Sequence, residues 1–238
     1  MAAKTYSAKL MQRIKRTPQV ESFRFLPEEK INFIPGQFLR LIFDEKNFAN
    51  KELNKYLSFS CSPQNNYIEV TKRLSTSSFS EKLNSLKLED RVLIEAAFGN
   101  CIFKEEYKKI AFLIGGIGIT PVISITEYIT AKGLDTHILL FYSNRTEEEI
   151  AFKKEFDTWS DINKNLKIFY TVTESQPKAS NCIFGRIDKP LLLEKIKHPD
   201  ERIFFIFGPP KMVEVMAQLS KDIGAKLENV KTESFLGY

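Results

Sequence analysis

KIAFLIGGIGITP, residues 109–121, joins a short apolar run to a glycine-rich turn and then to the start of a helix. The apolar residues 110–114 are too few to span a membrane and are bounded by glycines, which is typical of a strand buried on both faces. Glycine lets a backbone turn sharply and bring its N–H groups close to a ligand. The glycines of this turn are Gly115, Gly116 and Gly118. We expect Thr120 to be the N-cap of the helix and Pro121 its first residue.

A strand, a glycine turn and a helix N-terminus in this order form an arrangement that binds phosphate groups. A nucleotide is therefore the first ligand to consider. The stretch departs from the standard patterns, because Pro121 stands where G-x-G-x-x-G has its third glycine and no Gly-Lys-Ser/Thr follows. Such a turn is also a common connector between a strand and a helix, so this stretch alone leaves both interpretations open.

The composition is that of a globular protein long enough for two domains. The chain has 238 residues, of which 43% are hydrophobic and 27% charged. It shows no apolar run long enough for membrane insertion and no signal-peptide pattern at its start. Three scattered cysteines and two histidines argue against a disulfide framework, a zinc site or a protein-bound iron–sulfur cluster. We expect a cytoplasmic enzyme without a metal site.

The net charge of +5 is mild, and the lysines are spread among glutamates instead of forming a basic block. This distribution argues against nucleic acid as a partner. A modest positive excess suits an acidic protein partner or an anionic cofactor, although a solvated, lysine-rich surface is the simpler explanation.

The first half of the chain reads as short strands separated by turns. The segments rich in β-branched, aromatic or alternating apolar residues are 7–16, 20–26, 37–43, 57–62, 67–73 and 91–97. Six strands at this spacing predict a closed antiparallel barrel. The apolar spacing in residues 79–88 adds one short helix.

Two stretches of this half carry polar side chains suited to binding. KYLSFSCSP, residues 55–63, opens a strand with a cation and continues with hydroxyl and thiol groups. TKRLSTSSFS, residues 71–80, places two cations and several hydroxyls just before the expected helix, where they could cap it and also face a phosphate. An exposed strand face and a surface loop explain the two stretches equally well when each is taken alone.

From Tyr107 onward, strands alternate with helices, which predicts a parallel sheet with helices on both faces. The expected strands are 110–114, 137–143, 167–172 and 202–207, with a last one beginning near 231, and the expected helices are 121–132, 146–157, 189–197 and 209–223. This is a doubly wound layout, in which ligands bind at the carboxyl ends of the strands.

Taken together, these stretches resemble the ferredoxin-NADP reductase family over nearly the whole chain. The motifs that carry the resemblance, in the family's order, are FIPGQF (33–38), KYLSFSCSP (55–63), TKRLSTSSFS (71–80), GGIGITP (115–121), YSNRTEEE (142–149), FGPPKM (207–212) and ESF (233–235). The resemblance implies an FAD-binding barrel over residues 1–104 and an NAD(P)-binding α/β domain over residues 105–238.

The resemblance also implies roles for single residues. Ser58 would hydrogen-bond near the flavin N5, Lys55 and Ser80 would hold FAD phosphates, and Glu233 would relay a proton. Phe235 or Tyr238 would cover the flavin face that the nicotinamide must reach, although a packed C-terminal strand explains these last residues as well. The other residues that it assigns to cofactor binding are Tyr56, Leu57, Val70, Lys72, Ser78, Phe79, Gly115, Gly116, Gly118, Thr120, Pro121, Ser143, Arg145, Arg186, Gly208 and Pro209.

The chain departs from the family at several of these positions. Lys55 replaces an arginine, which removes a two-point grip on phosphate but keeps the charge. Leu57 replaces the aromatic residue that stacks on the flavin, and Thr76 and Ser77 replace glycines of the pyrophosphate loop. Phe207 stands where the family has a cysteine near the nicotinamide, and its ring would either hinder the nicotinamide or stack on it.

The implied activity is hydride transfer from NAD(P)H to flavin, followed by electron transfer to a small acidic acceptor protein such as ferredoxin or flavodoxin. Arg145 and Arg186 match positions that pair with a 2′-phosphate, but Glu174 would repel one, which favours NADH. Two alternatives are a reductase of free flavin or ferric chelates, and a flavin-binding electron-transfer subunit or module with no turnover of its own.

Overall fold

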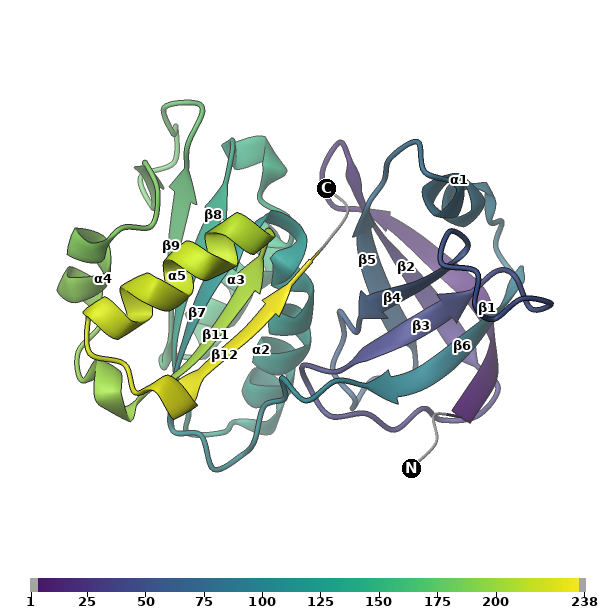
Figure 1. Cartoon of the computed structure of the whole chain (residues 1–238), viewed down its shortest axis with the longest axis horizontal. Coiled ribbons are helices and arrows are strands. Elements are labelled where there is room, and N and C mark those ends of the chain that lie inside the picture. Colours follow the sequence, from purple (N-terminus) through teal and green to yellow (C-terminus); the bar gives the residue numbers. More distant parts are fainter. Residues whose placement is uncertain (1–3, 236–238) are drawn as a thin grey trace. The chain divides into compact units, whose positions relative to one another are not determined.

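The computed structural model describes residues 4–235 (Figure 1). Its contacts group the chain into two compact units. Among the described residues, the first contains those up to Phe103 together with Thr120–Tyr128, and the second contains Lys104–Ile119 and those from Ile129 onward. Helix α2 (Thr120–Lys132) therefore belongs to the first unit over most of its length and to the second at its end.

The first unit is a six-stranded antiparallel sheet in the order β4-β3-β6-β1-β2-β5. Its elements are β1 (Lys4–Lys15), β2 (Val20–Pro27), β3 (Phe38–Ile42), β4 (Asn54–Ser58), β5 (Ile68–Arg73), α1 (Ser78–Ser85) and β6 (Arg91–Phe98). The outer strands β4 and β5 meet at a bridge between Phe59 and Val70, just beyond the end of β4. This arrangement confirms the expected antiparallel barrel.

Alternating side chains give the barrel its core. On β2, Phe23 and Phe25 are fully buried, and Leu39 and Leu41 are their equivalents on β3. Successive residues of a strand point to opposite faces, so each pair lies on one side of its strand and fills the interior. Burial of such a side chain contributes about 2 kcal/mol.

Helix α1 is held at both ends. The hydroxyl of Ser77 accepts a hydrogen bond from the backbone N–H of Ser80 at the N-terminus. At the C-terminus, the guanidinium of Arg13 on β1 donates to the backbone oxygen of Asn84 at 2.9 Å and to its side-chain oxygen at 2.7 Å. These contacts fix the orientation of the helix against the sheet.

The predicted strand over residues 57–62 was wrong in its limits. The observed strand is Asn54–Ser58, which pairs with β3 from Ile42 to Phe38. Beyond Ser58 the backbone leaves that ladder, because the N–H of Ser60 donates to the carbonyl of Glu69 instead. The hydroxyl-rich residues after Ser58 therefore cross between β4 and β5.

The second unit is a six-stranded parallel sheet in the order β10-β9-β8-β7-β11-β12. Its strands are β7 (Lys109–Gly115), β8 (His137–Asn144), β9 (Leu166–Val172), β10 (Cys182–Phe184), β11 (Ile203–Gly208) and β12 (Val230–Ser234), and its helices after α2 are α3 (Lys153–Ile162), α4 (Lys189–Lys195) and α5 (Pro210–Asp222). Continuous burial along β7, from Ile110 to Gly115, matches a strand covered on both faces.

The helices of this unit lie on both faces of the sheet. On one face, Leu192 of α4 and Met216 of α5 share an apolar core with Leu113 and Ile206 of the central strands. On the other face, Asp157 of α3 accepts a 2.9 Å hydrogen bond from the hydroxyl of Tyr170 on β9. The doubly wound layout is confirmed.

Two details of the second unit differ from the prediction. The helix expected over 146–157 begins only at Lys153, because Glu147–Glu149 form a 3-10 turn and Phe152 adopts a left-handed backbone with φ of 61°. Thr120 is not the N-cap of α2. Ile119 takes that place with helical angles and no side-chain bond, because the 3-10 turn Gly116–Ile119 winds directly into the helix.

Candidate functional site

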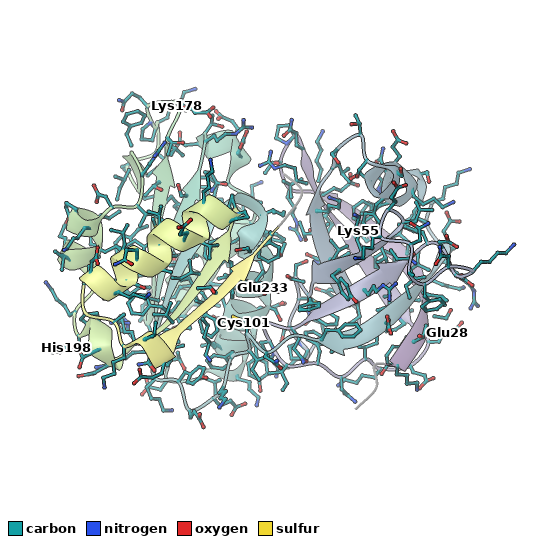
Figure 2. All side chains as sticks on the ribbon, in the orientation of Figure 1. Glu28, Lys55, Cys101, Lys178, His198 and Glu233 are labelled. Atoms are coloured by element: carbon teal, nitrogen blue, oxygen red, sulfur yellow. The ribbon has the colours of Figure 1, made fainter. Side chains whose placement is uncertain are left out.

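Strand β4 separates the predicted flavin-binding residues by the alternation of its side chains. Leu57 pairs with Leu39 and packs against the barrel core, and Lys55 points to the same side of the strand. Tyr56 and the buried Ser58 point to the other side. Figure 2 marks Lys55 on the first unit.

Tyr56 joins an aromatic cluster outside the barrel. Its ring packs edge-on against Phe38 and Phe98, each 5.5 Å away between ring centroids, and the side chain is 57% exposed. The structure therefore does not bring Tyr56 together with Lys55 and Leu57. Ring-to-ring packing accounts for its position without a cofactor.

A positively charged region lies where β4 and β5 meet. Lys72 of β5 is half-buried, and its pKa is lowered first by burial and then by the charge of Lys55. Two ammonium groups within range of mutual repulsion are stabilised by an anion between them. The arrangement favours a phosphate ligand.

Hydroxyl groups gather at the N-terminus of α1, a few residues after Lys72. Ser75, Ser77 and Ser80 hydrogen-bond one another at 3.1–3.2 Å. Ser78 is exposed at the start of the helix. Backbone N–H groups of a first helical turn attract anions, and these hydroxyls add donors at the same end.

Two further residues predicted to bind the flavin have buried side chains. Val70 and Phe79 are fully buried in the barrel core, and the Phe79 ring lies 5.2 Å from that of Phe43. These side chains are therefore not exposed to a ligand. They instead hold β5 and α1 in place.

The glycine turn after β7 uses its three glycines in different ways. A Cβ at Gly118 would overlap the carbonyl oxygen of Phe207 on β11, and one at Gly115 would overlap the sulfur of Met212. Gly118 is therefore required by the backbone of β11, whereas a side chain at Gly115 would need the flexible Met212 to move. Gly116 has a left-handed φ of 51° and open space where a Cβ would stand, so it is the position where the backbone faces outward.

The carboxyl ends of the parallel strands gather the remaining predicted residues on one edge of the sheet. Ser143 and Arg145 follow each other at the end of β8, Arg186 lies just beyond β10, and Gly208 and Pro209 join β11 to α5. Arg145 and Arg186 are exposed, while Gly208 is buried. Because β9 lies between β8 and β10, the two arginines flank one strand and do not adjoin.

The C-terminal strand adds Glu233 to this edge. Glu233 pairs with Phe207 in the parallel register of β12 and β11, and the N–H of Phe235 donates to the carbonyl of Gly208 at 3.0 Å. Burial raises the pKa of Glu233. Figure 2 marks this residue on β12. Tyr238 lies outside the described residues.

Two residues that end motifs quoted from the sequence, and that received no role of their own there, make contacts at this edge. Met212 fills the space beside Gly115 and Gly208. Glu149 forms a two-point ion pair with Arg145. The i, i+4 spacing of Arg145 and Glu149 was the available signal for the second contact.

Comparison with known proteins agrees with this geometry. A family model described as an oxidoreductase NAD-binding domain matches residues 112–218, which include the glycine turn, β8, β11 and most of α5. The crystal structure of a ferredoxin NADP+ reductase from Neisseria gonorrhoeae with bound FAD and NADP superposes with a TM-score of 0.83 and 22% identity, over 97% of this chain and 98% of that one. The chain has the ferredoxin-NADP reductase fold. The resemblance predicted from the sequence is thereby confirmed.

Curated relatives extend the likeness of this ferredoxin-NADP reductase fold to named enzymes. NADH-cytochrome b5 reductase 1 of Dictyostelium discoideum is 28% identical over 218 residues, covering 88% of this chain and 75% of that protein. Nitrate reductase [NADH] 1 of Nicotiana tabacum is 28% identical over 235 residues, covering 87% of this chain. The chain spans only 26% of the length of the tobacco enzyme.

Among residues 4–235, none of the helices combines the length and apolar character needed to cross a bilayer. In the same residues, no three His, Cys, Asp or Glu side chains gather as ligands for a metal ion.

Proposed function

We propose that this chain is an FAD-containing reductase that oxidises NAD(P)H and passes the electrons to an acceptor protein. The observation that supports the proposal is that each unit carries groups suited to a phosphate: Lys55, Lys72 and the N-terminus of α1 in the first, and the glycine turn in the second. A flavin dinucleotide and a nicotinamide dinucleotide each require such an end.

The residues of the first unit fit FAD. Lys55 and Lys72 would neutralise the pyrophosphate, and the hydroxyls of Ser77 and Ser80 would bond to it beside the first turn of α1. Leu57 offers an apolar side chain in place of a stacking ring, and Ser58 is buried at the end of β4. Because position 57 has no aromatic ring and position 55 has no arginine, we expect weaker FAD binding than in a protein with both.

The residues of the second unit fit a nicotinamide dinucleotide. The outward-facing backbone at Gly116 would receive its pyrophosphate, and Gly208 and Pro209 would lie under the nicotinamide. Glu233, whose pKa is raised by burial, holds its proton to higher pH than an exposed glutamate and would supply it near the flavin.

FAD, when bound, supplies the chemistry: it accepts a hydride from reduced nicotinamide and releases the electrons singly or as a pair. The chain binds and orients the two rings. The buried Phe207 favours packing of its ring within the sheet over a role in stacking on the nicotinamide.

For the acceptor, we propose a small acidic electron-transfer protein of the ferredoxin or flavodoxin kind. The net charge of +5 supports an acidic partner. The relatives do not share one name for their acceptor, since one is called a cytochrome b5 reductase and another a nitrate reductase.

The first experiment is an anaerobic visible spectrum of the purified protein, recorded before and after addition of NADH and, separately, NADPH. Bound flavin that bleaches with either nucleotide supports the proposed reductase activity. Flavin that bleaches with neither nucleotide would indicate that the protein binds flavin without turnover. Turnover is then compared with ferredoxin, flavodoxin, free flavin and ferric citrate as acceptors. Faster turnover with free flavin or ferric citrate than with ferredoxin or flavodoxin would contradict the proposed protein acceptor and support a reductase of free flavin or ferric chelates.

A further inference from the structure

The loop after β8 carries an arginine that already binds a carboxylate through one edge of its guanidinium. Arg145 donates from Nε to one carboxylate oxygen of Glu149 at 3.2 Å and from Nη2 to the other at 2.5 Å. This two-point geometry is the strong form of an arginine–carboxylate contact. The side chain of Arg145 is 55% exposed and that of Glu149 is 20% exposed, so Glu149 is the more firmly embedded partner.

The main chain of Arg145 also holds the loop that follows β9. Its carbonyl oxygen accepts hydrogen bonds from the N–H of Thr173 at 3.1 Å and of Glu174 at 2.9 Å. Glu174 is thereby kept near the guanidinium, and its charge adds to that of Glu149 in raising the pKa of Arg145. A second carboxylate thus acts on the same cation.

The far part of that loop is fixed by a third carboxylate. The two carboxylate oxygens of Glu147 accept hydrogen bonds from the backbone N–H groups of Lys178, at 2.8 Å, and Ala179, at 3.0 Å. Figure 2 marks Lys178 on this loop, beyond the end of β9. The loops after β8 and β9 therefore form one connected edge, which carries the carboxylates Glu147, Glu148, Glu149 and Glu174 beside the cations Arg145 and Lys178.

This edge lies where the adenosine ribose of a dinucleotide is expected. Strand β8 is the neighbour of β7, which carries the glycine turn, and its carboxyl end lies beside that turn in the parallel sheet. In such sheets a carboxylate after the next strand binds a free ribose 2′-hydroxyl, whereas an available arginine accommodates a 2′-phosphate.

We propose that Glu149 determines coenzyme specificity: by neutralising Arg145 and engaging its Nε–Nη2 edge, it makes the site select a dinucleotide with a free 2′-hydroxyl and reject one with a 2′-phosphate. The inference rests on the proposed function, since it concerns the nicotinamide nucleotide of that reaction. A 2′-phosphate carries up to two negative charges, would compete with Glu149 for the Nε–Nη2 edge of Arg145, and would be repelled by the carboxylates of Glu149 and Glu174. A 2′-hydroxyl meets no such cost and can donate to a carboxylate.

The test measures binding without any redox step. ADP-ribose and 2′-phospho-ADP-ribose are titrated into the protein by calorimetry, which needs no nicotinamide and no flavin reduction. We expect the wild type to bind ADP-ribose at least about tenfold more tightly than its 2′-phosphate. In Glu149→Ala, the affinity for the 2′-phosphate should rise about tenfold, while that for ADP-ribose changes less than about threefold.

A double variant shows whether Glu149 acts through the arginine. In Arg145→Ala/Glu149→Ala the gain for the 2′-phosphate should disappear, because no freed guanidinium remains to receive it. Asp161→Ala removes one negative charge at the end of α3, away from this edge, and should leave both affinities unchanged. A gain that survives in the double variant, or that appears in Asp161→Ala, would reduce the effect to net charge and overturn the proposal.

The outcomes separate this proposal from the proposed function. If neither ligand binds, the nucleotide site itself is refuted. If both bind with equal affinity in the wild type, or if Glu149→Ala leaves their ratio unchanged, the reductase stands and the role of Glu149 is refuted. Circular dichroism and retained ADP-ribose binding confirm that each variant is folded.

Discussion

Phe207 and Glu233 occupy the same register position on the neighbouring parallel strands β11 and β12. The ring of Phe207 is fully buried, with its centroid 5.9 Å from that of Phe205. Glu233 beside it is a carboxyl group whose pKa is raised by burial alone. The position under the expected nicotinamide therefore combines a filled apolar site with an acid whose pKa is raised.

Replacing Phe207 by the cysteine typical of the family should destabilise the protein. Phe207→Cys leaves a cavity beside Phe205 and should lower the free energy of unfolding by about 3 kcal/mol, as measured by urea denaturation. Phe207→Leu keeps most of the volume and should cost about 1 kcal/mol. A cysteine variant as stable as the wild type would mean that the Phe207 ring contributes little to the core.

Gly118 and Gly116 should respond differently to alanine. Gly118→Ala places a methyl group against the carbonyl oxygen of Phe207 and should cost about 3 kcal/mol or more of unfolding free energy. Gly116→Ala meets open space and only the left-handed backbone penalty, about 1 kcal/mol, but its methyl group would enter the expected phosphate site.

Calorimetric titration with ADP-ribose and thermal unfolding distinguish the two glycine effects. We expect Gly116→Ala to lose nucleotide affinity with little loss of stability, and Gly118→Ala to lose stability first. The reverse ranking would contradict the assignment of Gly116 to the ligand and Gly118 to packing.

Glu233 should make stability depend on pH in a definite direction. Its folded pKa lies above the ordinary value of 4.5, so the folded state keeps the proton while the unfolded chain releases it. Stability should therefore fall as the pH rises from below 4.5 through the raised pKa, and level off above it. Glu233→Gln has no such titration.

The measurement for Glu233 is a series of urea denaturations of the wild type and Glu233→Gln at several pH values from about 4 to 8. The difference in unfolding free energy should shift in favour of the glutamine variant as the pH rises. A constant difference would show that the carboxyl has an ordinary pKa.

The two lysines of the first unit should control flavin retention. Lys72→Ala removes the half-buried cation and should weaken FAD binding to the apoprotein by about tenfold, because one neutralising charge is lost. Lys55→Arg restores the planar fork typical of the family and should tighten binding. Titration of apoprotein with FAD, followed by flavin fluorescence, gives both affinities.

Lys30→Ala is the matched control for the lysine variants, because Lys30 is an exposed cation of the same unit. It should leave the FAD affinity unchanged. If Lys30→Ala and Lys72→Ala lose the same FAD affinity, the effect comes from net charge and not from a specific site at Lys72.

The sequence predicted most elements of this fold because their signals are local. The apolar run before Gly115 indicated a strand buried on both faces, and β7 is one. Alternating residues in the first half indicated an antiparallel barrel. The start of α3 was missed because it depends on the left-handed backbone of the buried Phe152, a conformation that no local preference favours for phenylalanine.

The candidate site was predictable as a set of segments but not as a set of contacts. Lys55 and Tyr56 are consecutive in one motif, yet the pleat of β4 directs them to opposite faces. Gly118 and Gly116 look equivalent in the sequence. Only the approach of β11 shows that Gly118 is needed for packing.

By itself, the sequence determined the order of strands and helices, the glycine turn and the likeness to one fold family, because periodicity and turn chemistry act between residues that are close in the chain. Tertiary structure alone decided which groups face one another: the closeness of Lys72 to Lys55, the pairing of Phe207 with Glu233, and the rotamers that join Arg145 to Glu149. Strand register and rotamer choice result from competition among all the packed neighbours of a residue, and that competition is settled only when the sheets have formed.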